Sequence, residues 1–156
     1  MEKNMEILKK YSKWILVCFV LIGFIFLFLP CGAYEYEGNL DYLSNGFQMI
    51  FGRKDQGYVI FGFNVLGFIL FLFLILCLII PWIKSKYTFI IETTLLFISC
   101  FLYGFLSITV NHERREVHSL FKGQIALYIG LIFLILALII SIYKLLLVLK
   151  KEKNSK

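Results

Sequence analysis

The chain has 156 residues, of which 60% are hydrophobic and only 2 are proline, and its formal net charge is +6. The hydrophobic fraction lies well above the roughly 45–50% that is usual in soluble proteins, and the chain is too short for two domains of ordinary size. These values exclude a soluble enzyme with a separate cofactor domain. They indicate an all-α membrane protein.

Four apolar segments are long enough to cross a hydrocarbon core about 30 Å thick, which needs roughly 20 helical residues. They comprise residues 14–30, 58–83, 87–110 and 123–149. None of them alternates between apolar and polar residues, which favours helices over barrel strands. We therefore expect a four-transmembrane-helix bundle with outer loops at residues 31–57 and 111–122. No linker or repeat divides the chain, so residues 1–156 are expected to form a single membrane domain.

The basic residues are distributed unevenly between the two sides of such a bundle. Eleven precede the first segment, separate the second from the third, or lie near the end of the fourth and after it, whereas five fall in the outer loops. Because Lys and Arg near helix ends are retained in the cytoplasm, both termini are expected there. The positive charge matches anionic lipid headgroups, so the expected partner is the lipid bilayer and not a nucleic acid. Aromatic belts are expected from Tyr11, Trp14, Trp82, Tyr87 and Tyr143 at the inner boundary, and from Tyr34, Tyr36, Tyr58 and Tyr128 at the outer one.

The start of the chain has some features of a removable signal peptide. A basic stretch precedes the first apolar segment, and the sequence Leu29-Pro30-Cys31-Gly32-Ala33 follows it. The apolar run of about 16 residues is at or beyond the upper limit for signal peptides. A lipoprotein would also need a small residue in place of Pro30. We therefore expect the first helix to be retained.

The cysteines exclude one class of membrane enzyme. Cys18, Cys77 and Cys100 fall inside the predicted helices, and Cys31 alone lies at the outer boundary. Membrane thiol oxidoreductases that pass electrons to quinones need cysteine pairs, and the sequence contains no C-x-x-C motif. Buried free cysteines usually act as small apolar residues, and we expect no redox role here.

The histidines give little support for a metal or a haem. His112 and His118 both lie in the second outer loop, where they cannot hold a haem between transmembrane helices. His112 and Glu116 would share a helical face, but the neighbouring arginines favour a solvated charged turn. No hydrolase, P-loop or zinc-protease motif is present. The sequence therefore predicts no cofactor, no metal and no enzymatic activity.

Small and polar residues form a stripe on each of the last two predicted helices. At 100° per residue, each stripe occupies an arc of about 60°. Helices in lipid associate through small residues that allow close approach. We expect the two stripes to face each other, with Cys100 and Ala137 at the same depth. The first stripe contains Thr93, Cys100, Gly104, Ser107 and Asn111, and the second contains Gly123, Ala126, Gly130, Ala137, Ser141 and Lys144.

Glu92 and Lys144 are predicted to form an intramembrane ion pair. Glu92 is the one acid within the four segments, and Lys144 is the one base well inside a segment. Glu92 could bind a proton or a cationic solute, as intramembrane carboxylates do in proton-coupled pumps. Alternatively, the two residues pair because neither could remain charged there alone. Their position, a turn or two from the cytoplasmic interface, favours the structural role.

The first outer loop is unusually apolar and aromatic. Tyr34-Glu35-Tyr36-Glu37 alternates like a short extended segment, and residues 40–51 favour a short amphipathic helix on the bundle or in the headgroup layer. Such a segment is either a plain lid or a contact surface, because aromatic and Met side chains are enriched in interface cores. The candidate partner surface consists of Tyr34, Tyr36, Phe47, Met49, Ile50 and Phe51.

Gly46-Phe47-Gln48-Met49-Ile50-Phe51-Gly52 contains the pattern G-F-x-x-I-F-G. This segment resembles the outer-loop motif of a group of uncharacterised small bacterial four-helix membrane proteins. The resemblance covers these seven residues and the overall plan of the helices. It implies a bacterial plasma membrane protein and supplies no activity.

Three classes of function are compatible with the sequence. The first is a non-enzymatic interaction or accessory protein that binds another membrane protein through its aromatic outer loop and helix surfaces. Immunity proteins against pore-forming bacteriocins share this size, topology and basic character. The second is an oligomeric transporter of a small solute or ion that uses Glu92, and the third is a structural or lipid-organising protein. The lack of charged residues near the bilayer midplane favours the first class.

Overall fold

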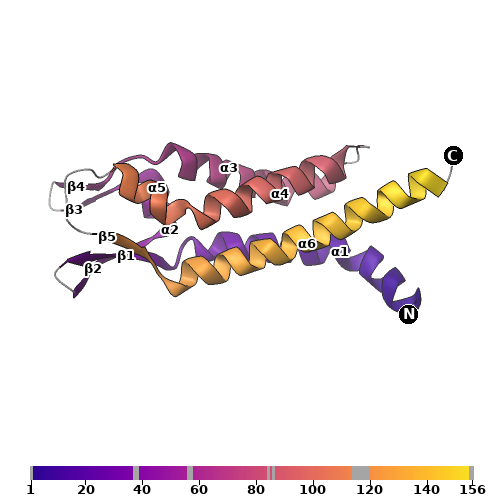
Figure 1. The fold of residues 1–156 in the computed structure, drawn as a ribbon, viewed down its shortest axis with the longest axis horizontal. Coiled ribbons are helices and arrows are strands. Elements are labelled where there is room, and N and C mark those ends of the chain that lie inside the picture. The colour runs from indigo at the N-terminus through magenta and orange to yellow at the C-terminus, as the bar shows by residue number, and fades with distance from the viewer. Residues whose placement is uncertain are drawn as a thin grey trace.

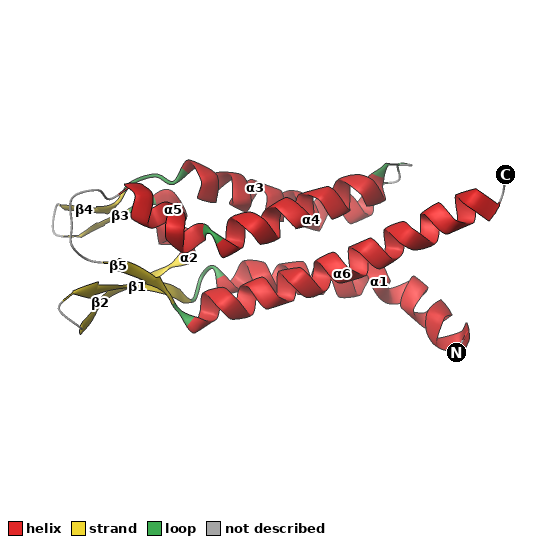
Figure 2. Ribbon diagram, viewed as in Figure 1, coloured by secondary structure: helices red, strands yellow, loops and turns green. Residues whose placement is uncertain are grey.

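The computed structural model shows an elongated bundle of helices that carries its strands at one end (Figures 1 and 2). The predicted helical class is confirmed, but of the five short strands among the described residues only an extended segment within β1 (Pro30–Tyr36) was expected. The backbone is described for residues 2–36, 39–55, 58–83, 85, 87–113 and 120–154. Side chains are described for residues 11–33, 43–53, 62–83, 85, 87–110 and 122–150.

Four long helical stretches build the bundle. They are α1 (Glu2–Phe26), α3 (Val65–Ile79) with the short 3-10 helix η1 (Ile80–Trp82), α4 (Thr88–Gly104) and α6 (Ile125–Asn154). Helix α6 packs most extensively against α1 and α4, and α3 packs against α4. Both ends of the chain lie at the end of the bundle where α3 connects to α4, and the strands lie at the opposite end (Figure 1). We call these the terminal end and the strand end.

Each helix buries a row of side chains spaced three or four positions apart. This spacing is typical of helices that pack nearly parallel and interlock their side chains. The rows meet along the axis of the bundle, and this is where the core lies. They contain Ser12, Leu16, Val20, Gly23 and Leu27 on α1; Gly67, Leu70, Leu74 and Cys77 on α3; Thr88, Glu92, Leu96, Ser99 and Tyr103 on α4; and Leu127, Gly130, Leu134, Ala137 and Ser141 on α6.

The outward faces of the helices are also apolar. Two stretches of the described chain, Val65–Trp82 and Ile125–Lys150, are long and apolar enough to cross a membrane, with mean hydropathies of 2.9 and 3.0. Of each window, 28% is buried inside the protein, so most of this apolar surface faces outward. Tyr11–Phe26 and Thr88–Gly104 are shorter apolar helices. Helices that are apolar on every side suit a lipid environment better than water.

The first helix is shifted relative to its predicted range of 14–30. It begins at Glu2, because Glu, Met, Leu and Lys are good helix formers and nothing separates them from the apolar run. It ends at Phe26, after which the amides of residues 27–29 bond carbonyls three positions earlier. Pro30 then begins a strand, and the residue before a proline disfavours helix.

Two other predicted segments also needed correction. The segment 58–83 starts with a strand, and its helix begins only at Val65, where Asn64 is the N-cap and its side chain accepts from the Gly67 amide at 2.9 Å. The segment 87–110 is divided into α4 and α5 (Leu106–Glu113), with Phe105 between them. Asn64 also donates to Thr109 of α5 at 2.8 Å, which holds α5 against the start of α3.

The strand end combines a three-stranded antiparallel sheet, a hairpin and a short helix. The sheet has the order β2-β1-β5, with β1 (Pro30–Tyr36), β2 (Asn39–Asn45) and β5 (Leu120–Gly123). The hairpin pairs β3 (Arg53–Asp55) with β4 (Tyr58–Phe61). In the chain, α2 (Gly46–Phe51) connects β2 of the sheet to β3 of the hairpin. The expected extended segment is present as β1, but residues 39–45 form a strand where a helix was predicted.

The pairing of β1 with β5 explains why α1 and α6 lie together. Strand β1 follows α1, and β5 precedes α6, with Gly32 opposite Gly123 in the ladder. The Gln124 amide also donates to the Cys31 carbonyl at 2.8 Å. The first and last helices therefore leave the sheet side by side, as Figure 1 shows.

Candidate functional site: a buried polar cluster and an exposed aromatic strip

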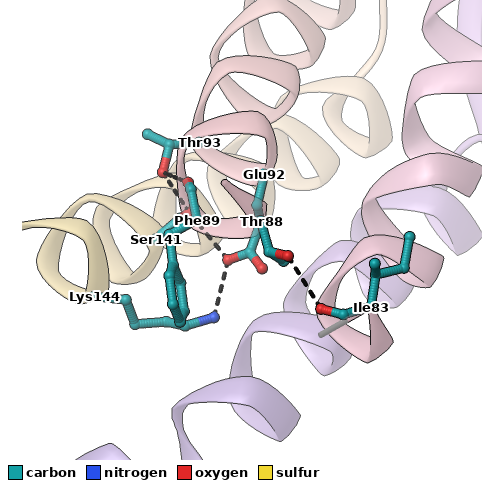
Figure 3. Close-up of polar contacts among 7 residues, drawn as sticks. All are labelled: Ile83, Thr88, Phe89, Glu92, Thr93, Ser141 and Lys144. Carbon is teal, nitrogen blue, oxygen red and sulfur yellow. Dashed lines mark hydrogen bonds and ion pairs between the residues drawn. The ribbon is translucent and has the colours of Figure 1, made fainter. Parts of the chain in front are cut away.

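The structure brings Glu92 of α4 and Lys144 of α6 together near the terminal end of the bundle (Figure 3). Lys144 Nζ donates to Glu92 Oε1 at 2.9 Å. The Glu92 side chain is 1% exposed and the Lys144 side chain 11%. Ser141, one turn before Lys144, donates its hydroxyl to the same carboxylate oxygen at 3.1 Å. Two donors from α6 thus converge on one oxygen from α4.

Thr93 extends this cluster by one more hydroxyl group. Thr93 Oγ1 lies 2.8 Å from Ser141 Oγ and 2.8 Å from the Phe89 carbonyl oxygen. Each hydroxyl carries one proton. Because Ser141 gives its proton to Glu92, Thr93 is the donor whenever the two hydroxyls bond each other. Otherwise Thr93 donates to Phe89 within its own helix.

The second oxygen of Glu92 has no such partner. Glu92 Oε2 is buried and makes no hydrogen bond with the described residues, and the same holds for Ser99 Oγ. A buried polar atom without a partner costs about 1–3 kcal/mol, and more when the group is charged. Removing one member of a buried ion pair costs about 3–5 kcal/mol. The cluster therefore holds α4 to α6 firmly while one of its acceptor sites stays unused.

The predicted stripes are placed differently on the two helices. On α6, Gly130, Ala137 and Ser141 belong to the buried row, while Gly123 and Ala126 are half-buried. On α4 the buried positions are shifted by one residue toward the N-terminus relative to the predicted stripe, so that Glu92, Ser99 and Tyr103 are buried in place of Thr93, Cys100 and Gly104. Thr93, Cys100 and Ser107 of that stripe are half-buried, Gly104 is exposed, and the side chain of Asn111 lies outside the described residues.

The physical reason is that a large side chain, not a small one, fits against the α6 glycine. A Cβ atom added at Gly130 would collide with the Tyr103 hydroxyl. Tyr103 is fully buried, and its hydroxyl donates to the Gly23 carbonyl of α1 at 3.2 Å. Tyr103 thereby contacts both neighbouring helices. The two predicted stripes therefore meet at Thr93 and Ser141, whereas at Gly130 a large side chain of α4 stands where a small one was expected.

The candidate partner surface needs a second correction. Met49 and Ile50 are fully buried and cannot contact a partner, whereas Phe47 is 39% exposed and Phe51 is half-buried. Helix α2 begins with a capping box, in which Asn45 accepts from the Gln48 amide at 2.8 Å and the Gln48 side chain accepts from the Asn45 amide at 3.2 Å. The side chains of Tyr34 and Tyr36 lie outside the described residues.

Four phenyl rings form a continuous row near the strand end. Phe47 stacks on Phe28 with ring centroids 5.8 Å apart and contacts Phe51 at 4.3 Å, and Phe51 contacts Phe63 at 6.4 Å. Phe28 is 50% exposed and Phe63 51%. We call these four residues the phenyl strip. The sequence revealed its middle but not its ends, because Phe28 and Phe63 follow α1 and precede α3.

The remaining chemistry-bearing residues form no further site. Among the described residues, no three His, Cys, Asp or Glu side chains are grouped closely enough to hold a metal ion. The four cysteines are free, and Cys31 is buried with its thiol donating to the Phe26 carbonyl at 2.9 Å. Burial raises the pKa of Cys31 from 9.0 to about 11. The side chains of His112, Glu116 and His118 lie outside the described residues.

Comparisons of the chain with protein-family models, with curated proteins and with solved structures found no match.

Proposed function

We propose that this chain is an integral membrane protein that crosses a bacterial plasma membrane four times, with both termini in the cytoplasm. Two helices meet the length and hydropathy required for crossing. The 17 residues of α4 are separated by Phe105 alone from the eight residues of α5, and α1 has 25 residues in all. At about 1.5 Å per residue, each of these stretches can span a core about 30 Å thick.

Aromatic and basic side chains at the terminal end support this placement. Trp14 and Trp82 are both about half exposed, and their rings meet edge to face with centroids 5.1 Å apart. Lys13 Nζ lies 3.7 Å from the centre of the Trp82 ring. Tryptophan beside lysine is typical of the membrane–water interface on the cytoplasmic side.

Within the membrane, we propose that the protein acts as a non-enzymatic accessory protein that binds another membrane protein through the phenyl strip. The observation that carries this proposal is that the middle of the strip is held rigidly against the rest of the protein. Phe47 and Phe51 project from a helix that is capped at its start and held against the bundle by the buried Met49 and Ile50. Pre-ordered aromatic side chains lose little entropy on binding and are favoured at interface centres. Immunity-type protection against a pore-forming bacteriocin would be one instance of such a role.

A photo-crosslinking residue placed in living cells tests the proposal. The photoreactive amino acid would replace Phe47 or Phe63 of the strip and, as a matched control, Phe97, which is 63% exposed on the lipid-facing side of α4. We expect a discrete protein adduct of defined mass at the strip positions and only lipid adducts at Phe97. Identical lipid adducts at all three positions would contradict a role in binding another protein.

A further inference from the structure

The unpartnered oxygen of Glu92 lies in a defined place. Figure 3 shows Glu92 Oε2 pointing away from Lys144 and Ser141, on the side of the carboxylate where Thr88 lies. Thr88 and Glu92 are one turn apart on the same face of α4, and both are buried. Side chains at this spacing have Cβ atoms about 5–6 Å apart, a gap that one small molecule can bridge.

The Thr88 hydroxyl has capacity for one more bond. It donates to the Ile83 carbonyl at 3.0 Å and accepts from the Ser85 amide at 3.2 Å. A hydroxyl oxygen has two lone pairs, so one remains free after these two bonds. Two acceptors, Glu92 Oε2 and Thr88 Oγ1, are thus available one turn apart, and neither can satisfy the other.

The charge of the cluster restricts what can fill this gap. The single negative charge of Glu92 is already matched by Lys144 at 2.9 Å. A cation beside Oε2 would be repelled by that ammonium group, because both would lie within a few ångströms in a medium of low polarity. The guest must therefore be uncharged and must donate two hydrogen bonds. Water is the smallest molecule that does so.

Thr88 lies close to the solvent-exposed terminal end. It is in the first turn of α4, directly after the α3–α4 connection, where Ile83 is 52% and Tyr87 60% exposed. Beyond Glu92 the neighbouring buried positions Leu74, Leu96 and Leu134 are apolar and offer a water molecule no partner. Ser99 Oγ, the other buried polar atom without a partner, lies about two turns farther along α4.

We propose that Glu92 Oε2 and Thr88 Oγ1 form a buried water site that exchanges with solvent at the terminal end of the bundle. The site goes beyond the accessory role, since it is remote from the phenyl strip and would exist whatever the strip binds. It explains how a carboxylate oxygen can be buried without a partner in the protein, because a water molecule donates a hydrogen bond to it. It also makes the Glu92–Lys144 pair a hydrated point of the core close to the terminal end.

Radiolytic hydroxyl labelling of the purified protein in lipid nanodiscs tests the site, with water itself as the probe. Radicals form on bound water and oxidise the side chains beside it. The reporters are Ile80, which is 8% exposed, and Leu96, which is fully buried one turn after Glu92 on α4. The controls are Leu70 and Leu106, 0% and 1% exposed; Leu106 lies beside Gly67, at the strand-end start of α3. We expect several-fold more oxidation at the reporters than at the controls. Equal oxidation of all four would overturn the proposal.

Two variants locate the water. Glu92→Leu combined with Lys144→Met removes both charges together, and Thr88→Val removes one acceptor while keeping the shape of the side chain. We expect reporter oxidation to fall to the control level in the double variant and to fall several-fold in Thr88→Val. Unchanged oxidation in both would contradict the site. Constant labelling at Leu70 and Leu106 verifies the fold, and if a variant fails to fold, the comparison within the native protein still decides.

Discussion

The two halves of the bundle are held together by different interactions. In the terminal half, the core contains Ser12, Thr88, Glu92 and Ser141, and helices α4 and α6 are joined by directional bonds to one carboxylate oxygen. In the strand half, the corresponding contact is Tyr103 fitted against Gly130, with large apolar residues around it. Two ways of joining apolar helices, polar bonding and close shape complementarity, thus occur in one protein.

The largest effect is expected from breaking the charge pair. Glu92→Gln leaves the Lys144 ammonium without a counter-charge, and Lys144→Met leaves the carboxylate alone. Each change should lower the free energy of unfolding by about 3–5 kcal/mol, measured by denaturant titration in mild detergent. The double variant should recover most of this loss, because no charge then remains buried. Additive losses in the double variant, with a total equal to the sum of the two single losses, would show that the two residues do not act as a pair.

The strand half is tested by Gly130→Ala. The added methyl group would collide with the Tyr103 hydroxyl and lie 3.0 Å from Phe26 Cβ. Overpacking of this kind costs about 1–3 kcal/mol, read from the same titration. Gly104→Ala is the matched control, because its Cβ would have only Leu131 nearby, at an ordinary 3.6 Å. If both variants lose the same stability, close fit is not what holds this half.

A smaller effect is expected from the cap that joins α3 and α5. Asn64→Ala removes the bonds to the Gly67 amide and the Thr109 hydroxyl, both within 2.9 Å. Losing an N-cap costs roughly 1 kcal/mol. Thermal unfolding should therefore shift modestly downward, whereas Asn64→Asp, which still accepts from Gly67, should retain part of the stability. If Asn64→Ala loses more stability than the Glu92 variants, the expectation that the charge pair makes the larger contribution is wrong.

The smallest effect is expected for the Cys31 thiol. Its burial slows the reaction of the thiol with alkylating reagents and leaves the folding stability near neutral pH unchanged. Its pKa is raised from 9.0 to about 11 because the group is buried. The folded protein therefore keeps the proton that an unfolded thiol loses above pH 9, and folding stability falls only between pH 9 and 11. At pH 8 alkylation of Cys31 should be about a hundredfold slower than for an exposed thiol, since each pKa unit is a factor of ten. Rapid alkylation at pH 8, followed by peptide mass spectrometry, would show that the residue is accessible.

The sequence was informative where a single residue type is constrained by its environment. Glu92 and Lys144 could be matched because a charge within an apolar segment needs a partner, and the two residues lie at similar depth. The helical class followed from the length of the apolar runs. The buried row of α6 was also recognisable, since glycine, alanine and serine recur along it.

The sequence was less informative where distant segments select one another. The β1–β5 pairing joins residues 85 to 91 positions apart, Gly32 and Gly123 among them. An extended segment could be expected within β1, but nothing in the sequence indicates which strand it pairs with. The fit of Tyr103 against Gly130 and Gly23 depends on three helices at once. The phenyl strip likewise draws its four rings from three separate parts of the chain, so its composition could not be read from one loop.

The join between β1 and β5 also has a consequence for how the protein is made. During synthesis, α1 emerges first, but the strand and the helix that fix its position, β5 and α6, emerge last. Until then α1 has only its limited contacts with α3 and the strand-end elements. The first helix therefore reaches its final position in the bundle only after nearly the whole chain has been synthesised. A truncation before Leu120 should accordingly leave an incomplete bundle that cellular proteases degrade.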